Sequence, residues 1–151
     1  MKKVWILFLA SLFATVLLTS PLAYLISYIL SEQHNGHAIS SLIAQYQQMK
    51  RNPFFTSLLS VFPFILLAVL VVIAQKRKTS AEKCYVVMVC GALAIFVIMF
   101  WINLVYWPNF LPDVPYPGFP HGLELVIAPL FFAPVGMLIG VLCGWFIVKG
   151  K

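Results

Sequence analysis

Charged side chains are scarce in this sequence. Of its 151 residues, 9% are Asp, Glu, Lys or Arg, whereas 62% are hydrophobic, and the mean hydropathy is +0.98. A water-soluble domain of this size could not hide so much apolar surface behind so few charges. The composition therefore excludes a soluble globular protein and indicates an integral membrane protein.

Ionisable groups are missing from the middle of every long apolar run. Membrane enzymes and proton-coupled carriers normally retain such groups at depth, because a charge in hydrocarbon is costly and is kept for function. We therefore expect neither a proton-coupled antiporter nor an intramembrane aspartyl peptidase nor a haem protein. No nucleophile with a nearby base can be named, so no enzyme is expected.

Cysteine is also rare. Its three occurrences, Cys84, Cys90 and Cys143, fall toward the ends of apolar runs that we assign to the cytoplasmic half. This placement argues against disulfides and against a dithiol coupled to quinones. We interpret the three thiols as small apolar fillers.

What the sequence does contain is four apolar runs of about 20 residues or more, the length needed to span a bilayer. They cover approximately residues 4–30, 54–75, 84–107 and 123–148. The connections are too short to fold as separate domains. The runs predict one all-α membrane domain over residues 1–151, a bundle of four transmembrane helices.

The basic residues lie at the ends of these runs rather than in a patch with interleaved aromatics, so the net charge of +6 does not indicate nucleic-acid binding. Eight of the ten flank the termini and the second connection: Lys2, Lys3, Lys76, Arg77, Lys78, Lys83, Lys149 and Lys151. The positive-inside rule then predicts that both termini are cytoplasmic. Compact loops and a short basic N-terminus favour a bacterial inner membrane.

The first outward connection contains a periodic segment with Ile39, Leu42, Ile43, Tyr46 and Met49 at helical spacing. It predicts a short amphipathic helix. We interpret this helix as a cap on the bundle or as a segment lying in the membrane interface, with binding of a partner as the alternative.

The third connection, residues 108–120, holds five of the ten prolines together with aromatic residues. Such a segment is stiff, extended and amphipathic. It predicts an ordered lid over the outer face of the bundle.

Prolines also fall inside apolar runs, among them Pro63, Pro129 and Pro134. Each removes a backbone donor, which neighbouring helices or water must compensate. The last two predict a bend in the outer half of the final helix.

Several single residues carry local expectations. The pattern from Thr79 to Glu82 fits a capping box at the start of the third helix. Tyr24 and Tyr28 suit a membrane interface. Asn103, the strongly polar residue near the outer end of the third run, is expected to form a hydrogen bond with another helix.

The last apolar run carries Gly136, Gly140 and Gly144 at intervals of four residues. This spacing places them on one helix face, where a neighbouring backbone can approach closely. The face serves either packing inside one chain or a seam between two copies in a homo-oligomer, and the sequence leaves both open.

A polar constellation remains on the outward side. His34 and His37 lie in the first connection, while His121 and Glu124 stand at the start of the last run. Imidazole and carboxylate groups are suitable ligands for zinc or copper(II). The alternative is ordinary loop composition, with Glu124 favoured by the dipole of its helix. No other cofactor is expected.

These features favour a non-catalytic interaction protein, either an accessory subunit or an inhibitor, with membrane lipids and a membrane-protein or toxin partner. The layout is similar to that of the bacterial immunity proteins that protect against pore-forming colicins, which are small, basic, four-span proteins of the inner membrane. No motif is shared with them. The alternative function is a small carrier, a channel or a metal-binding membrane protein that uses the outward histidines.

Overall fold

The computed structural model describes residues 2–31, 37–47, 53–111 and 123–149, which are helical apart from short turns and contain no strand. By length and composition, three helices could cross a membrane: Lys2–Leu30, Ala81–Phe110 and Leu125–Lys149. The prediction of an all-helical chain with membrane-spanning segments is confirmed at this level. The count of four spans stays a prediction.

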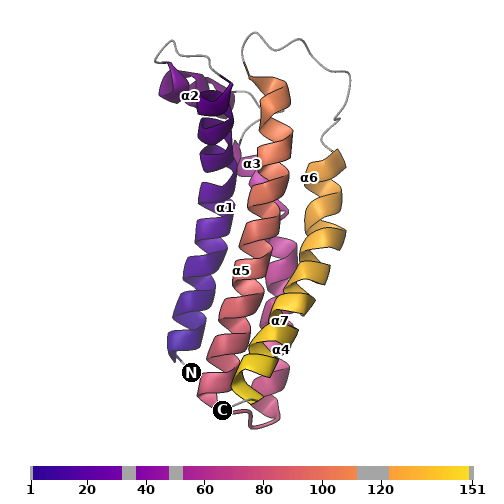
Figure 1. Cartoon of the computed structure of the whole chain (residues 1–151). Coiled ribbons are helices and arrows are strands. Elements are labelled where there is room, and N and C mark those ends of the chain that lie inside the picture. Colours follow the sequence, from indigo (N-terminus) through magenta and orange to yellow (C-terminus); the bar gives the residue numbers. More distant parts are fainter. Residues whose placement is uncertain (1, 32–36, 48–52, 112–122, 150–151) are drawn as a thin grey trace.

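The helices follow one another along the chain without any intervening domain (Figure 1). They are α1 (Lys2–Leu30), α2 (Ala38–Gln47), α3 (Pro53–Leu58), α4 (Val61–Lys76), α5 (Ala81–Tyr106), the 3-10 helix η2 (Trp107–Phe110), α6 (Leu123–Ile127), the π-helix η3 (Ala128–Phe132) and α7 (Ala133–Lys149).

Helix α5 is the centre of the bundle. Its most extensive contacts are with α7 and α1, and α4 packs against it as well. The core around α5 is apolar, with fully buried Met88, Ile95 and Met99 meeting Phe64 of α4 and Met137 of α7. The two termini lie at the same end of the bundle (Figure 1).

The second predicted span is divided. Helix α3 ends at Leu58 and α4 begins at Val61, so one run of the sequence becomes two helices joined by a tight turn. Pro63 explains the break, because it has no N–H for the carbonyl of Leu59 and its ring crowds that carbonyl. The carbonyl of Leu59 accepts the N–H of Phe62 instead, at 3.1 Å.

Unlike Pro63, the two prolines of the last run do not end a helix. Helices α6 and α7 are joined through η3, where the N–H of Ala133 donates to the carbonyl of Ala128. This wider turn absorbs the missing donors of Pro129 and Pro134 without ending the helix. The expected disturbance therefore takes the form of a π-turn.

The start of α5 differs by one residue from the sequence prediction. The N-cap is Ser80, whose hydroxyl accepts the N–H of Lys83 at 3.3 Å. Thr79 therefore does not cap the helix, and the pairing of Thr79 with Glu82 in a capping box is wrong. The physical reason is that the extended backbone of Ser80 aims its own hydroxyl at the first turn.

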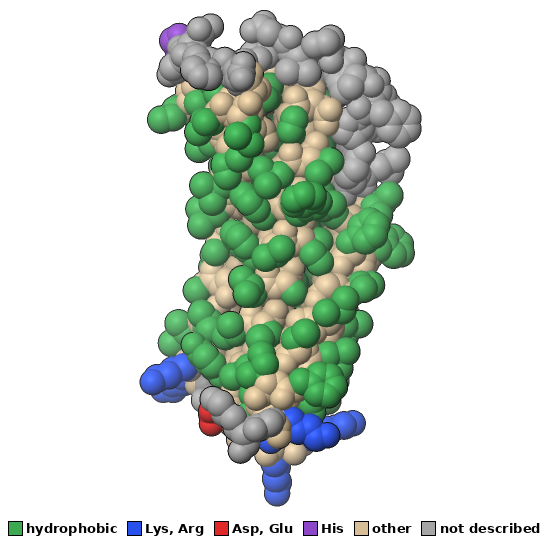
Figure 2. Space-filling view, in the orientation of Figure 1, with side chains coloured by type: hydrophobic (Ala, Val, Ile, Leu, Met, Phe, Trp, Pro, Cys, Tyr) green, Lys and Arg blue, Asp and Glu red, His purple; other side chains and the backbone are tan. Residues whose placement is uncertain are grey.

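Charge divides the molecule into two ends. Lysine and arginine side chains gather at the end that carries the termini and the α4–α5 turn, which we call the basic end (Figure 2). Hydrophobic side chains cover the surface between this end and α2. We call the opposite end, where α2 lies, the α2 end.

Candidate interaction surface at the α2 end

Helix α2 is fixed to the bundle by one polar and one apolar contact. The hydroxyl groups of Tyr24 in α1 and Ser41 in α2 are hydrogen-bonded at 2.5 Å. Next to this bond, Ala38 and Leu42 pack against the aromatic cluster below. The helix therefore lies against the end of α1 in a defined orientation.

That orientation leaves most of the predicted apolar face of α2 uncovered. Ile39, Ile43 and Tyr46 are 69%, 54% and 42% exposed, respectively, whereas Gln45 is 7% exposed. We call the three exposed residues the α2 stripe. Among the described residues of the predicted apolar face, only Leu42 packs against the aromatic cluster. Ser41 and Gln45 lie beside it on the side of α2 that faces the bundle. Partial burial raises the pKa of the Tyr46 phenol, so this side chain stays neutral.

An aromatic cluster supports α2 from below. The indole N–H of Trp107 donates to the hydroxyl of Ser20 at 2.9 Å, and both residues are buried. The ring of Trp107 meets that of Tyr24 edge to face, with centroids 5.2 Å apart. Tyr28 is 6% exposed and also belongs to the cluster. Both rings are therefore covered by other side chains of the bundle, and the prediction that Tyr24 and Tyr28 lie at the level of a membrane interface stays a prediction.

Asn103 lies fully buried in α5, four residues before Trp107. Its amide donates to the carbonyl of Met99 in its own helix, at 2.8 Å. The side-chain oxygen has no hydrogen-bond partner among the described residues. Among the described residues, the expected bond to another helix is therefore not formed, and the amide donor instead uses the i−4 carbonyl of its own helix.

The outward histidines are placed only in part. His37 is exposed and directly precedes α2. Its backbone carbonyl accepts two hydrogen bonds, one from the hydroxyl of Ser40 and one from the backbone N–H of Ser41, each at 2.9 Å. His34, His121 and the side chain of Glu124 lie outside the described residues, so their predicted metal site is not tested. Within the described ranges, no three His, Cys, Asp or Glu side chains are grouped as a metal site. Of the predicted lid at residues 108–120, residues 108–110 belong to the 3-10 helix η2 and are not extended, and residues 112–120 fall outside the described residues.

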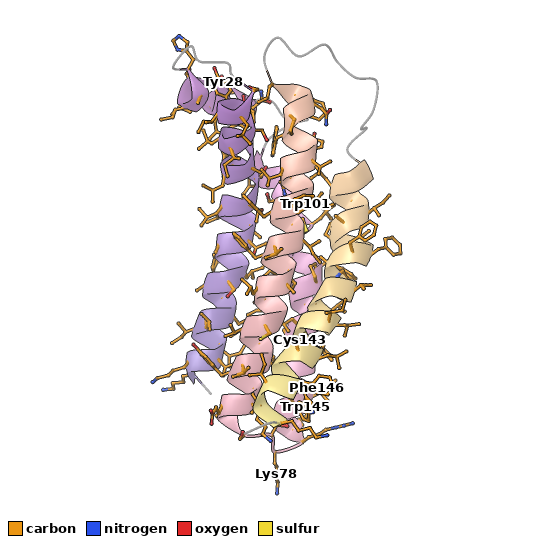
Figure 3. All side chains as sticks on the ribbon, viewed as in Figure 1. Tyr28, Lys78, Trp101, Cys143, Trp145 and Phe146 are labelled. Atoms are coloured by element: carbon orange, nitrogen blue, oxygen red, sulfur yellow. The ribbon has the colours of Figure 1, made fainter. Side chains whose placement is uncertain are left out.

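The glycine face of α7 lies against α5. A Cβ atom at Gly140 would stand 2.5 Å from the carbonyl oxygen of Cys90, and one at Gly144 would stand 3.0 Å from the Cα of Val87. At Gly136 the nearest neighbour is the flexible end of Ile98. The face is occupied within the chain, so α7 presents other side chains outward, including Trp145 and Phe146 (Figure 3).

A second small-residue face, on α1, was missed by the sequence reasoning. Thr15, Thr19, Ala23 and Ser27 recur every four residues and are all buried. The hydroxyls of Thr15 and Thr19 donate to carbonyls one turn back, at 2.8 and 2.6 Å. These internal bonds let polar residues lie between apolar helices. The four-residue spacing was the signal that could have identified this face.

In comparisons with known proteins, no protein-family model, no curated protein and no solved structure matches the chain.

Proposed function

We propose that this protein is a non-catalytic interaction protein of a bacterial inner membrane, of accessory-subunit, inhibitor or immunity type, whose partner binds at the α2 stripe. The observation that carries the proposal is the exposure of Ile39, Ile43 and Tyr46 on a helix that is itself firmly attached. Exposed apolar side chains on a positioned element are typical of a protein or membrane contact.

Two further features support an interaction role over chemistry. The middle of the long helices carries no ionisable group, so the bundle offers no acid or base to a reaction or to a transported proton. The glycine face of α7 is already filled by α5, so a partner must bind at another exposed surface, and the α2 stripe is one of these. The partner class is a membrane protein or a toxin.

The basic end defines the orientation in this proposal. With its lysines and arginines in the cytoplasm, the termini face inward and the α2 stripe faces the outer side of the membrane. A toxin or a membrane protein approaching from that side meets α2 first.

The test places a photo-crosslinking amino acid at Ile43, in the stripe, or at Ser40, an exposed residue on the same helix. After irradiation of native membranes, the adducts are identified by mass spectrometry. We expect one discrete protein adduct from position 43 and none from position 40. Equal labelling at both positions, or lipid adducts alone at position 43, would overturn the proposal.

A second result would redirect the function to the outward histidines. In that case the protein is recovered alone with zinc or copper, and His37→Ala abolishes function without lowering the protein level. The interaction proposal instead expects His37→Ala to be tolerated and Ile43→Gln to lose the partner at normal protein level.

A further inference from the structure

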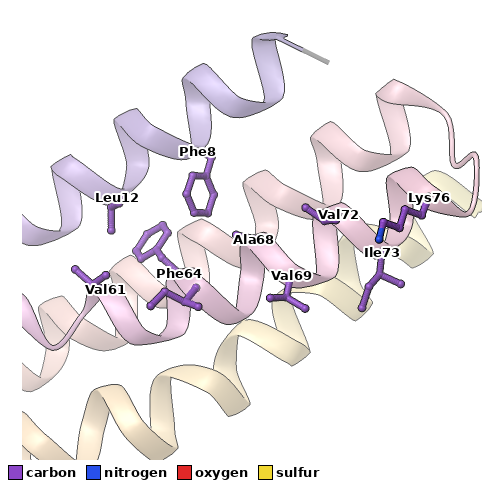
Figure 4. A pocket seen from close by; sticks show the side chains of 10 residues that line it. Phe8, Leu12, Val61, Phe64, Ala68, Val69, Val72, Ile73 and Lys76 are labelled. Atoms are coloured by element: carbon purple, nitrogen blue, oxygen red, sulfur yellow. The ribbon is translucent and has the colours of Figure 1, made fainter.

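An apolar groove runs between α1 and α4 on the outer surface of the bundle (Figure 4). Its volume is about 500 Å³, within the ~300–1,000 Å³ typical of ligand sites. Phe8 and Phe64 form its floor, edge to face with centroids 5.7 Å apart. Leu12 and Val69 line its walls. The groove therefore presents an unbroken hydrocarbon surface.

One end of the groove is cationic. Lys76, the last residue of α4, lines it at the basic end and is exposed. On the other side of α4, a smaller groove of about 190 Å³ is lined by Arg77 and Lys83, and Ile73 borders both grooves. Positive side chains thus stand at the same level on both sides of α4. A ligand that lies in the main groove and reaches its end meets this positive charge.

The groove is long enough to hold an acyl chain of one leaflet of a bilayer, since its lining on α4 runs from Val61 to Lys76. Lys76 and Phe64 both line it and stand twelve residues apart on α4. At 1.5 Å per residue this is about 18 Å along the helix axis. Half of a ~30 Å hydrocarbon core is about 15 Å. A single acyl chain whose headgroup sits at Lys76 would therefore end near Phe64.

The walls of the groove favour an acyl chain over a helix. Close helix docking in a membrane needs small residues that let two backbones approach. This chain follows that rule where α7 meets α5, at Gly140 and Gly144. The α1–α4 groove has no glycine in its lining, and its bulky side chains keep a second backbone at a distance. A flexible hydrocarbon chain can follow such a surface.

We propose that the α1–α4 groove binds an anionic phospholipid, with one acyl chain along Phe8 and Phe64 and the phosphate at Lys76. Basic sites between membrane helices suit anionic headgroups, and each lysine near the surface strengthens such binding. This site lies at the opposite end of the protein from the α2 stripe, so it stands independently of the function proposed above.

The headgroup arm of the test uses the full chain reconstituted in phosphatidylcholine bilayers that contain spin-labelled phosphatidylglycerol or spin-labelled phosphatidylcholine. Electron paramagnetic resonance then measures the motionally restricted fraction of each lipid. We expect selectivity for phosphatidylglycerol that falls about fivefold in Lys76→Gln, because one lysine–headgroup contact is lost. Lys149→Gln removes the same charge from the end of α7 and should retain most of the selectivity.

The acyl-chain arm fills the groove instead. Val69 is 50% exposed and lines the groove, so Val69→Trp should lower the restricted fraction of both lipids. Val97→Trp, at a 55% exposed position of α5 outside the groove, is the matched control and should not lower it.

Three results would overturn the proposal. In the first, the two spin-labelled lipids are restricted equally in the unaltered protein. In the second, Lys76→Gln and Lys149→Gln reduce selectivity to the same extent, which would indicate surface potential alone. In the third, the unaltered protein forms crosslinked dimers and Val69→Trp does not, which would assign the groove to a second copy of the chain.

Discussion

At the scale of single residues, several buried polar side chains of the bundle donate hydrogen bonds to carbonyls of their own helices. Thr15 and Thr19 each donate to a carbonyl one turn back, and the amide of Asn103 does the same with Met99. In each threonine, the O–H donor of the side chain is therefore hydrogen-bonded. A primary amide has an additional acceptor, and at Asn103 this oxygen is buried without a described partner. Asn103 is therefore a residue whose polarity costs stability.

Replacing Asn103 with leucine tests this directly. Leucine has a similar volume, and the change removes an unsatisfied buried acceptor that costs about 1–3 kcal/mol, along with a hydrogen bond worth about 1 kcal/mol. We expect Asn103→Leu to be as stable as the unaltered protein or more stable, by up to about 2 kcal/mol. Thermal unfolding in mild detergent provides the measurement.

Asn103→Asp is the control at the same position. It keeps the shape but loses the amide donor and places an ionisable group in a fully buried site, so it should unfold well below the unaltered protein. A clear loss of stability in Asn103→Leu would mean that the amide oxygen has a partner that holds two helices together.

At the scale of elements, the contact between α5 and α7 depends on where each glycine faces. At Gly140 an added Cβ meets the backbone carbonyl of Cys90 at 2.5 Å and the Cβ of Ala94 at 2.9 Å. Neither can move without shifting α5. At Gly136 the obstacle is the tip of the Ile98 side chain, which can adopt another rotamer.

We therefore expect Gly140→Ala to destabilise the monomer by about 1–3 kcal/mol, the usual cost of forcing an extra group into a packed contact. Gly136→Ala should cost less. Unfolding in detergent and size-exclusion chromatography separate this prediction from a dimer seam. If Gly140→Ala or Gly140→Leu stays folded and loses only self-association, the face belongs to a contact between two chains.

The sequence predicts which segments are helical, and its errors concern which way a helix faces. Apolar runs and capping residues mark the helices because hydropathy and backbone hydrogen bonding are local properties. Tyr24 and Trp107 come together through contacts between α1 and η2, two elements that lie far apart in the sequence. The orientation of α2 likewise depends on contacts with α1 and the aromatic cluster, among them the hydrogen bond between Tyr24 and Ser41. Neither contact leaves a periodic signal in the sequence.

The division of the second run shows a different limit. Pro63 is visible in the sequence, yet a proline inside a membrane run can bend a helix, widen a turn or end a helix. Here Pro63 separates α3 from α4, whereas Pro129 lies in a π-turn that keeps the helix continuous. Whether a proline bends, widens or ends a helix depends on how the neighbouring helices pack around it. Hydropathy alone therefore predicts the run and not its break.

At the scale of the whole molecule, the bundle is asymmetric along its axis. The basic end carries compact turns, while the α2 end carries the amphipathic helix. Helix α4 has 16 residues, about 24 Å at 1.5 Å per residue, which is shorter than a hydrocarbon core of ~30 Å. In the predicted arrangement of four spans, a helix of this length would thin the nearby bilayer or be extended by its flanking residues. The lysines and arginine that follow α4 can serve in this way at the basic end.

This asymmetry leads to a prediction about orientation. Single cysteines are introduced at Lys78 or Ser40, both exposed, in a variant whose native Cys84, Cys90 and Cys143 are replaced by alanine. In intact cells, a membrane-impermeant maleimide should label the Ser40→Cys variant and should label Lys78→Cys only after the membrane is opened, because basic turns remain on the cytoplasmic side. Labelling of Lys78→Cys in intact cells, with protection of Ser40→Cys, would invert the molecule. It would also place the α2 stripe on the cytoplasmic face, out of reach of a partner that approaches from outside.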